Sequence, residues 1–91
     1  MIPLYLYHVY ILESETTGKW YYGFTESIEQ RTADHQSNRA GYTRNKGPWR
    51  LIFDRPFKEK IEALSFERYL KNCKIKKFIR DTFSTFFVTW P

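Results

Sequence analysis

Two short aromatic segments separated by a polar turn constrain the fold of this chain more than any other feature. His8-Val9-Tyr10 lies within a run of bulky residues from Leu4 to Leu12, and Tyr21-Tyr22-Gly23 lies within the run from Lys19 to Phe24. The residues that separate the two runs are polar and end in Thr-Thr-Gly, which is typical of a hairpin turn. The two runs therefore predict the two strands of a β-hairpin.

The alternation within each predicted strand assigns its side chains to faces of the sheet. Residues two positions apart share a face, so Tyr10 lies with His8, and Tyr21 lies with Gly23. Both alternating sets of the first strand are bulky, which predicts a central strand covered on both faces. Gly23 has two interpretations, a plain packing role or room for the close approach of a phosphate.

A helix is predicted directly after the hairpin. Ser27 has the character of an N-cap residue, and Gln30, three positions later, is its capping-box partner. The helix would end near Asn38 and would place Arg31 and His35 one turn apart on the same side. It therefore presents an arginine and a histidine just past the hairpin.

The segment from residue 39 to residue 48 is predicted to be a loop because it contains two glycines and a proline. It carries Arg39, Arg44 and Lys46 around Tyr42. Basic residues interleaved with an aromatic ring suit phosphate contacts and stacking on a base or sugar, whereas the alternative is an ordinary solvated loop.

The second half of the chain predicts one more strand and two more helices. The strand covers Trp49 to Phe53, with Leu51 and Phe53 alternating against Arg50 and Ile52, and a turn through Asp54-Arg55-Pro56 follows it. The first helix runs from Lys58 to about Cys73, and the second from Lys74 to about Phe83. The predicted inward residues are Ala63, Phe66, Leu70 and Cys73 in the first helix and Ile75, Phe78 and Ile79 in the second, with Lys74, Lys76, Lys77 and Arg80 outward.

Glu67 lies at the edge of the inward stripe of the first of these helices. A carboxylate at the edge of a core is costly without a partner, so Glu67 either pairs with a cation such as Arg31 or binds a metal ion. Periodicity alone favours the ion pair.

Length and composition indicate how many domains the chain forms and in which cellular compartment it works. Ninety-one residues form one small domain over residues 1–91, and the aromatic tail 82–91 is too apolar to stay in water, so it should pack on the domain or on a second copy in a homodimer. The single cysteine, Cys73, and the absence of a signal peptide or a membrane-spanning stretch predict a cytoplasmic protein with no membrane partner. There is no zinc-ligand spacing, glycine-rich nucleotide loop or nucleophile elbow.

The charges are distributed unevenly along the chain. Residues 1–38 hold two basic and five acidic groups, whereas residues 39–91 hold thirteen basic and five acidic groups. The second half is therefore the part that would hold a polyanion.

Taken together, these pieces resemble the GIY-YIG nuclease family, in particular its short single-domain members. The two motif tripeptides appear as His8-Val9-Tyr10 and Tyr21-Tyr22-Gly23 at the family's spacing, followed by Arg31 and His35, by Tyr42-Thr43-Arg44, and by residues 62–67, which end in Glu67. The resemblance implies an α/β (α+β) fold, a small three-stranded and largely antiparallel sheet flanked by helices. It also favours the phosphate interpretation of Gly23.

The resemblance also implies a site. Glu67 would hold one divalent cation, Mg²⁺ or Mn²⁺, Arg31 would bind the scissile phosphate, and Tyr10 would take a proton from the attacking water. A phenol needs a nearby cation or metal for that role, because its ordinary pKa is about 10. The remaining implied residues are Tyr21, which positions water or phosphate, His35, which orients Tyr10 or transfers protons, and Lys19, which adds positive charge.

Two functions remain open from the sequence. One is a metal-dependent endonuclease that hydrolyses DNA, structure-directed as in repair or recombination, on branched or single-stranded substrates. The other is a catalytically weak or inactive nucleic-acid-binding module, because His8 stands where the family motif has glycine. Besides these two functions, the aromatic tail leaves a homo-oligomeric scaffold as a further hypothesis.

Overall fold

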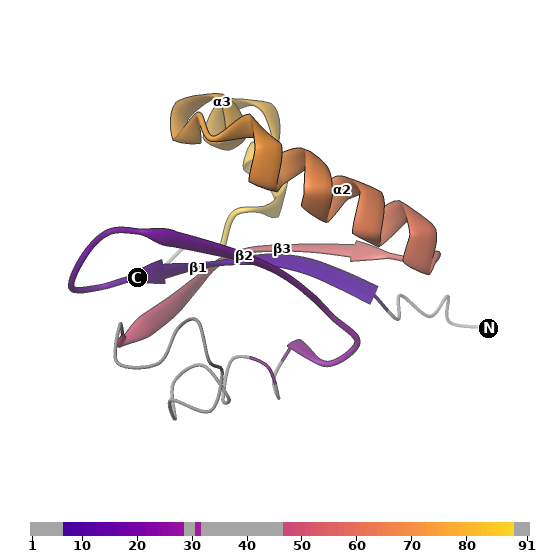
Figure 1. Cartoon of the computed structure of the whole chain (residues 1–91), viewed down its shortest axis with the longest axis horizontal. Coiled ribbons are helices and arrows are strands. Elements are labelled where there is room, and N and C mark those ends of the chain that lie inside the picture. Colours follow the sequence, from indigo (N-terminus) through magenta and orange to yellow (C-terminus); the bar gives the residue numbers. More distant parts are fainter. Residues whose placement is uncertain (1–6, 29–30, 32–46, 89–91) are drawn as a thin grey trace.

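The computed structural model contains a three-stranded sheet, and the helices labelled in Figure 1 lie on one face of it. The structure describes residues 7–28, 31 and 47–88. Strands β1 (Tyr7–Ser14), β2 (Trp20–Thr25) and β3 (Trp49–Phe57) lie in the order β2-β1-β3, and both neighbouring pairs are antiparallel. The predicted hairpin, the central place of its first strand and the antiparallel three-stranded sheet are therefore confirmed.

The hairpin turn is held by the backbone and by one buried hydroxyl. The Ser14 amide donates to the Lys19 carbonyl at 2.9 Å, and the Gly18 amide donates to the Ser14 carbonyl at 2.9 Å. Gly18 has a φ of 75°, which a residue with a side chain rarely adopts. The Ser14 hydroxyl also accepts the amides of Thr16 and Thr17, so the polar turn satisfies its own backbone.

Strand β3 is longer than predicted, and its pattern is different. It continues to Phe57, so the turn predicted through Asp54-Arg55-Pro56 is wrong. Pro56 can lie in this strand because β3 is at the edge of the sheet, where a missing amide donor is tolerated. The register with β1 shifts between Ile11 and Leu12, which leaves Ile52 as an extra residue.

The bulge at Ile52 changes which side chains share a face. Ile52 and Phe53 both belong to the core beneath the helices, whereas Leu51 packs on the opposite face with Leu12 and Trp49. The predicted alternation, in which Leu51 and Phe53 share a face, is therefore wrong. A bulge of this kind leaves no signal in simple period-two counting.

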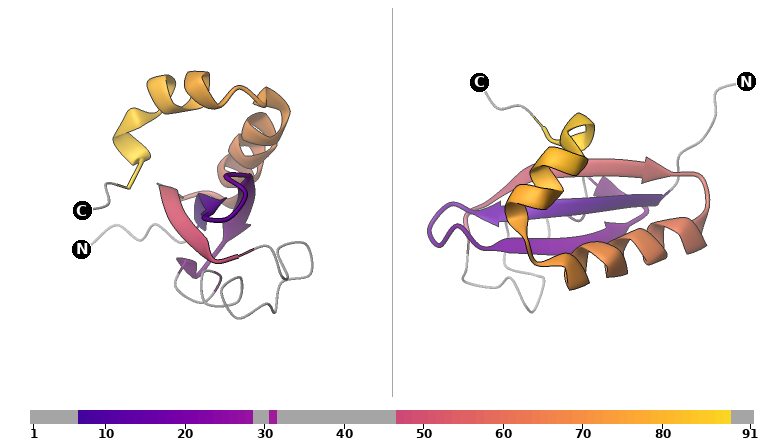
Figure 2. Two further views of the ribbon diagram at one scale, coloured as in Figure 1. Left: turned by 90° about the vertical axis from the view of Figure 1, so that its left-hand side faces the viewer. Right: turned by 90° about the horizontal axis from the view of Figure 1, so that it is seen from above.

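Helices α2 (Lys60–Cys73) and α3 (Lys76–Thr82) cover the face of Val9 and Ile11. Seen from above, α2 runs beside β2 and α3 crosses the strands toward β3 (Figure 2). The predicted stripe of α2 is confirmed, because Ala63 and Leu70 are fully buried and Phe66 and Cys73 pack against the core.

The inward residues predicted for the last helix are mostly wrong. Ile79 is fully buried, but Ile75 is 62 % exposed and Phe78 is 44 % exposed. The reason is that the helix ends before Lys74, which adopts a left-handed φ of 54°, and a new helix, α3, starts at Lys76. A helix of seven residues then buries little more than one residue against the sheet.

The described part of the C-terminal tail packs on this same domain. Phe53 is surrounded by Phe66, Phe86 and Phe87 with ring centroids 6.3, 6.0 and 5.0 Å away. The Val88 amide donates to the Ile52 carbonyl at 2.8 Å, next to a β-bridge between Phe53 and Phe87. Burying a phenylalanine of this kind stabilises the fold by about 1.5–3 kcal/mol.

No helix within the described residues is long and apolar enough to cross a membrane.

Candidate active site

Tyr10 lies at the centre of the candidate site, on the face of the sheet opposite α2 and α3. It is only 1 % exposed and packs with Leu12 and Trp49, with Tyr21, Ile28 and Leu51 at the margin. Its ring centroid is 6.3 Å from that of Tyr21. The two motif phenols therefore meet on one surface.

Gly23 stands directly opposite Tyr10 in the register of the hairpin. A Cβ atom at Gly23 would collide with the ring carbons and the hydroxyl of Tyr10. The space that the missing side chain leaves is thus filled by the Tyr10 phenol. This corrects the interpretation of Gly23 as room for a phosphate, because the close approach is made by a side chain of the protein itself.

Arg31 reaches the same phenol from the segment that follows β2. Ile28 and Arg31 are helical, and the Arg31 amide donates to the Ser27 carbonyl at 3.1 Å. That bond is the first turn expected from the N-cap at Ser27, whereas its predicted capping partner Gln30 lies outside the described residues. The side chain of Arg31 forms a hydrogen bond with Tyr10.

The pKa of Tyr10 is shifted by its burial and by the charged and polar groups near it. Burial raises the pKa of Tyr10 above its ordinary value of 10.0, and the Tyr21 phenol and the Glu67 carboxylate add to this increase. The hydrogen bond and the positive charge of Arg31 lower the pKa but do not outweigh burial. Tyr21, Arg31 and Glu67 therefore each lie within electrostatic reach of Tyr10.

Glu67 lies on α2 and forms an ion pair with Lys71. The Lys71 Nζ and Glu67 Oε2 atoms are 3.6 Å apart, one helical turn from each other. The Glu67 side chain is 18 % exposed and that of Lys71 is 53 % exposed. A pair this long and this open to water contributes little to stability.

A single carboxylate of this kind fits a Mg²⁺ ion. The described residues contain no group of three or more His, Cys, Asp or Glu side chains that could enclose a metal. Mg²⁺ keeps several water ligands and is commonly held by one or two carboxylates together with substrate phosphate oxygens. Glu67, a partly exposed carboxylate within electrostatic reach of Tyr10, offers one ligand of that kind.

The other predicted site residues are not all brought to Tyr10. Lys19 lies at the turn end of β2, four residues before Gly23, which corresponds to about 13 Å along a strand. Its backbone amide is bound by the Thr17 hydroxyl, and its side chain is not among the groups around Tyr10. His35 and the predicted nucleic-acid contacts Arg39, Tyr42, Arg44 and Lys46 lie outside the described residues.

A histidine–carboxylate pair flanks Tyr10 and was not anticipated from the sequence. His8 Nδ1 lies 2.8 Å from Asp54 Oδ1, and Asp54 stands directly opposite Tyr10 in the β1–β3 register. Sequence reasoning missed it because it placed Asp54 in a turn. The polar residue at His8, in place of the motif glycine, was the available signal.

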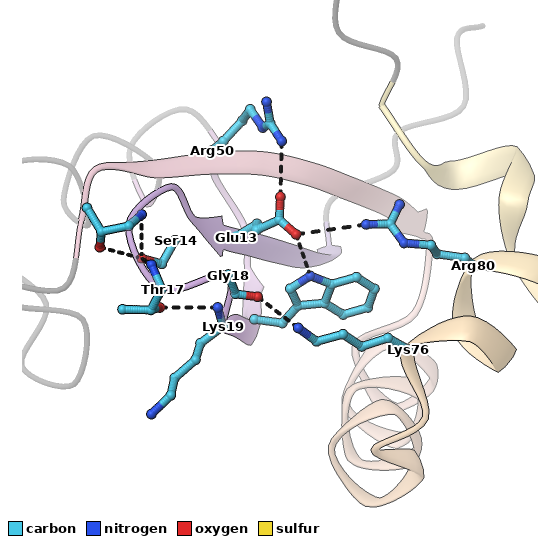
Figure 3. A network of polar contacts seen from close by, with 10 residues as sticks. Glu13, Ser14, Thr17, Gly18, Lys19, Arg50, Lys76 and Arg80 are labelled. Atoms are coloured by element: carbon cyan, nitrogen blue, oxygen red, sulfur yellow. Dashed lines mark hydrogen bonds and ion pairs between the residues drawn. The ribbon is translucent and has the colours of Figure 1, made fainter.

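A second polar cluster occupies the turn end of the same hairpin, around Glu13 (Figure 3). Its carboxylate accepts Trp20 Nε1 at 2.9 Å and Arg50 Nη2 at 3.0 Å, with Arg80 Nη2 at 3.8 Å. The hydrogen bond from Trp20, together with the two arginines, holds the pKa of Glu13 below its ordinary value. The four residues come from four elements, so this cluster fastens α3 and β3 to the hairpin.

The family of this chain follows from its fold and this site together. Residues 6–78 match the GIY-YIG catalytic domain, and the chain belongs to the GIY-YIG family, whose members are generally nucleases. The match covers all three strands and α2, including Tyr10, Tyr21, Arg31 and Glu67.

Several sequences similar to this chain are UPF0213 proteins. The chain is 39 % identical over 72 residues to the UPF0213 protein BH0048 of Halalkalibacterium halodurans, covering 78 % of this chain and 76 % of that protein. It is 32 % identical over 71 residues to the UPF0213 protein YazA of Bacillus subtilis, covering 77 % and 72 %.

A solved structure supports the same fold. The solution NMR structure of the UPF0213 protein BH0048 from Bacillus halodurans superposes with a TM-score of 0.52 at 36 % sequence identity. The alignment covers 84 % of this chain and 81 % of that one. The GIY-YIG-like fold predicted from the motifs is therefore confirmed.

Proposed function

We propose that this protein is a metal-dependent endonuclease that hydrolyses phosphodiester bonds of DNA in a structure-directed manner, as in repair or recombination. The observation that carries the proposal is the convergence of Tyr10, Tyr21, Arg31 and Glu67, which come from three different parts of the chain. Hydrolysis of a phosphodiester needs positive charge on the phosphate, an activated water and a stabilised leaving oxygen. The four side chains offer groups suited to these tasks.

Arg31 binds the scissile phosphate in this proposal. Its planar guanidinium matches two phosphate oxygens and stays charged at every working pH. Glu67 would hold the divalent ion, with water and phosphate oxygens completing its coordination. A Mg²⁺ or Mn²⁺ ion bound there would neutralise phosphate charge and lower the pKa of the hydroxyl groups around it.

Tyr10 and Tyr21 handle water and protons. Tyr10 is neutral in the protein alone, because burial raises its pKa, so before substrate binds it holds its proton at the phenol oxygen. In the substrate complex, Arg31 and a bound cation would lower that pKa, so that Tyr10 would first release its own proton to solvent; the phenolate would then accept the proton of the attacking water, and Tyr21 would position that water or the phosphate. His35 orients Tyr10 or relays its proton, and Arg39, Tyr42, Arg44 and Lys46 contact the DNA on either side.

The raised pKa of Tyr10 is also what favours the second candidate, a nucleic-acid-binding module with a weak or inactive site. A base with a pKa above 10.0 removes a proton only if bound charge lowers that pKa substantially. If no metal binds, the same residues hold a phosphate without cutting it.

Cleavage assays with matched variants test the proposal. Purified protein is incubated with branched, single-stranded and plain duplex DNA in Mg²⁺, in Mn²⁺ and with chelator. We expect metal-dependent cutting that falls at least about a hundredfold in Arg31→Ala and Glu67→Ala, while Arg68→Ala, on the exposed side of α2, cuts normally. Binding without cutting in either metal would instead establish the binding module, and cutting that survives both site variants would defeat the residue assignment.

A further inference from the structure

A groove lined by aromatic rings and lysines runs along β2 from the candidate site toward the hairpin turn. It consists of two neighbouring cavities that share Trp20 and Tyr22 as walls. The first, of about 370 Å³, is lined by Trp20, Tyr21, Tyr22 and Lys71. The second, of about 400 Å³, is lined by Thr17, Lys19, Trp20, Tyr22, Trp49, Lys74 and Lys76. We refer to both together as the β2 groove.

The β2 groove begins at the candidate active site. Tyr21 lines its first cavity and is also the partner of Tyr10, with ring centroids 6.3 Å apart. Lys71 lines the same cavity and is the ion-pair partner of Glu67. A chain-like ligand bound beside Tyr21 and Glu67 would therefore reach the groove by passing around β2, which is an edge strand of the sheet.

The charges along the groove are positive and come from separate elements. Lys19 belongs to the hairpin, Lys71 to α2, and Lys74 and Lys76 to the junction between α2 and α3. Lys76 donates to the Gly18 carbonyl at 2.8 Å and lies 5.0 Å from the centre of the Trp20 ring, which fixes one wall of the groove (Figure 3). Lys19 and Lys74 are exposed at its rim.

This combination of features points to one class of ligand. Lysines spaced along a groove attract a phosphate backbone, and aromatic side chains between them stack on bases that are not paired. Bases in a duplex are already stacked on each other, so they cannot enter cavities walled by Trp20 and Tyr22. An uncharged apolar ligand would not use the positive charges of Lys19 and Lys74 at the rim.

We propose that the β2 groove binds a single-stranded segment of nucleic acid that continues from the phosphate held at Arg31. A base lies against the ring of Tyr22, next to the Trp20 ring that Lys76 and Arg80 cover, and its phosphates contact Lys19 and Lys74. The location of the groove beside Tyr21 links this inference to the proposed nuclease function. Strand binding itself needs neither metal nor cutting.

The charge contribution is tested by fluorescence anisotropy of a short labelled oligo(dT) in the presence of chelator. The double variant Lys19→Gln/Lys74→Gln is compared with Lys60→Gln/Lys77→Gln, which removes the same charge from exposed positions outside the groove. We expect the groove variant to bind on the order of tenfold more weakly and to lower the salt slope by about 1.4, since each phosphate contact on a single strand contributes about 0.7. Equal affinities for the two double variants would overturn the proposal.

The stacking contribution needs a second pair of variants. Tyr22→Phe keeps the ring, whereas Tyr22→Leu keeps apolar packing against the core but removes the stacking surface. We expect Tyr22→Phe to bind normally and Tyr22→Leu to bind oligo(dT) at least about fivefold more weakly, with duplex binding unchanged. The proposal is overturned if the two variants bind the single strand alike, or if free thymidine monophosphate competes as well as the oligonucleotide does.

The two proposals fail separately. If the groove variants weaken binding but the protein cuts no DNA, the proposal for the β2 groove is supported and the proposed nuclease function is contradicted. Metal-dependent cutting with binding that ignores the groove variants would do the reverse.

Discussion

The two ends of the β1–β2 hairpin carry polar clusters of opposite character. At the turn end, Glu13 accepts hydrogen bonds from Trp20 and Arg50 and forms an ion pair with Arg80. The negative charge of Glu13 is therefore compensated within the fold. At the other end, Glu67 pairs with Lys71 at 3.6 Å, where water reaches both side chains, and Arg31 hydrogen-bonds the buried Tyr10. One cluster fastens elements together, and the other gathers a phenol, a guanidinium and a carboxylate within electrostatic reach of the buried Tyr10.

Conversion of each carboxylate to its amide gives the largest and most direct contrast. We expect Glu67→Gln to lower DNA cleavage at least about a hundredfold with little change in the melting temperature, because its ion pair is long and exposed. Glu13→Gln should cleave at the parental rate. Cleavage rates and thermal melts of both variants decide this, and the contrast disappears if Glu67→Gln cuts as well as the parent.

Glycine substitutions separate crowding at the site from backbone strain at the turn. Gly23→Ala places a methyl group into the ring of Tyr10, so we expect a loss of about 1–3 kcal/mol in unfolding free energy together with loss of cleavage. Gly18→Ala meets no neighbour within 4 Å but forces a side chain onto a φ of 75°. It should cost about 1–2 kcal/mol and leave cleavage intact. Denaturant titration of both variants measures the two terms, and a fully stable Gly23→Ala would show that Tyr10 does not lie over Gly23.

The Glu13 cluster should also be visible in acid. Because the pKa of Glu13 is held below its ordinary 4.5, its contribution is present above that pH and is lost as the pH falls through the lowered value. We expect Glu13→Gln to lose about 1 kcal/mol at neutral pH and to show a flatter decline of stability below pH 4.5. Urea titrations between pH 7 and pH 3 measure this, and parallel curves for variant and parent would contradict it.

The smallest expected effect lies at the alkaline end. Burial raises the pKa of Tyr10 above 10.0, so the neutral phenol stabilises the fold below pH 10 and this contribution is lost as the pH rises through the raised value. Tyr10→Phe should therefore retain more of its stability in alkali than the parent does, whereas Tyr69→Phe, at an exposed position of α2, should not. Unfolding followed by circular dichroism from pH 8 to pH 11 distinguishes them, and identical alkaline profiles of the two variants would count against a buried Tyr10.

The motifs predicted more of the site than periodicity predicted of the fold's second half. The motif spacing and strand alternation placed Tyr10 and Tyr21 on one face, and the helical stripe of α2 placed Glu67 at the edge of the core. The periodic pattern gave the wrong faces at β3, because a bulge at Ile52 puts two consecutive residues into one core. It also failed at α3, because the left-handed Lys74 ends one helix and changes the direction of the next. Both failures arise from single backbone irregularities, which a count of periodic positions does not detect.

The sequence alone determined the hairpin, the central strand and the pairing of the motif phenols, because these depend on alternation and on distances of a few residues. Only the tertiary structure decided that Gly23 makes room for Tyr10 itself, that Asp54 joins His8 beside it, and that Lys19 belongs to the β2 groove. These features depend on which side chains from distant segments occupy the same volume. Close packing settles that, and local preferences do not.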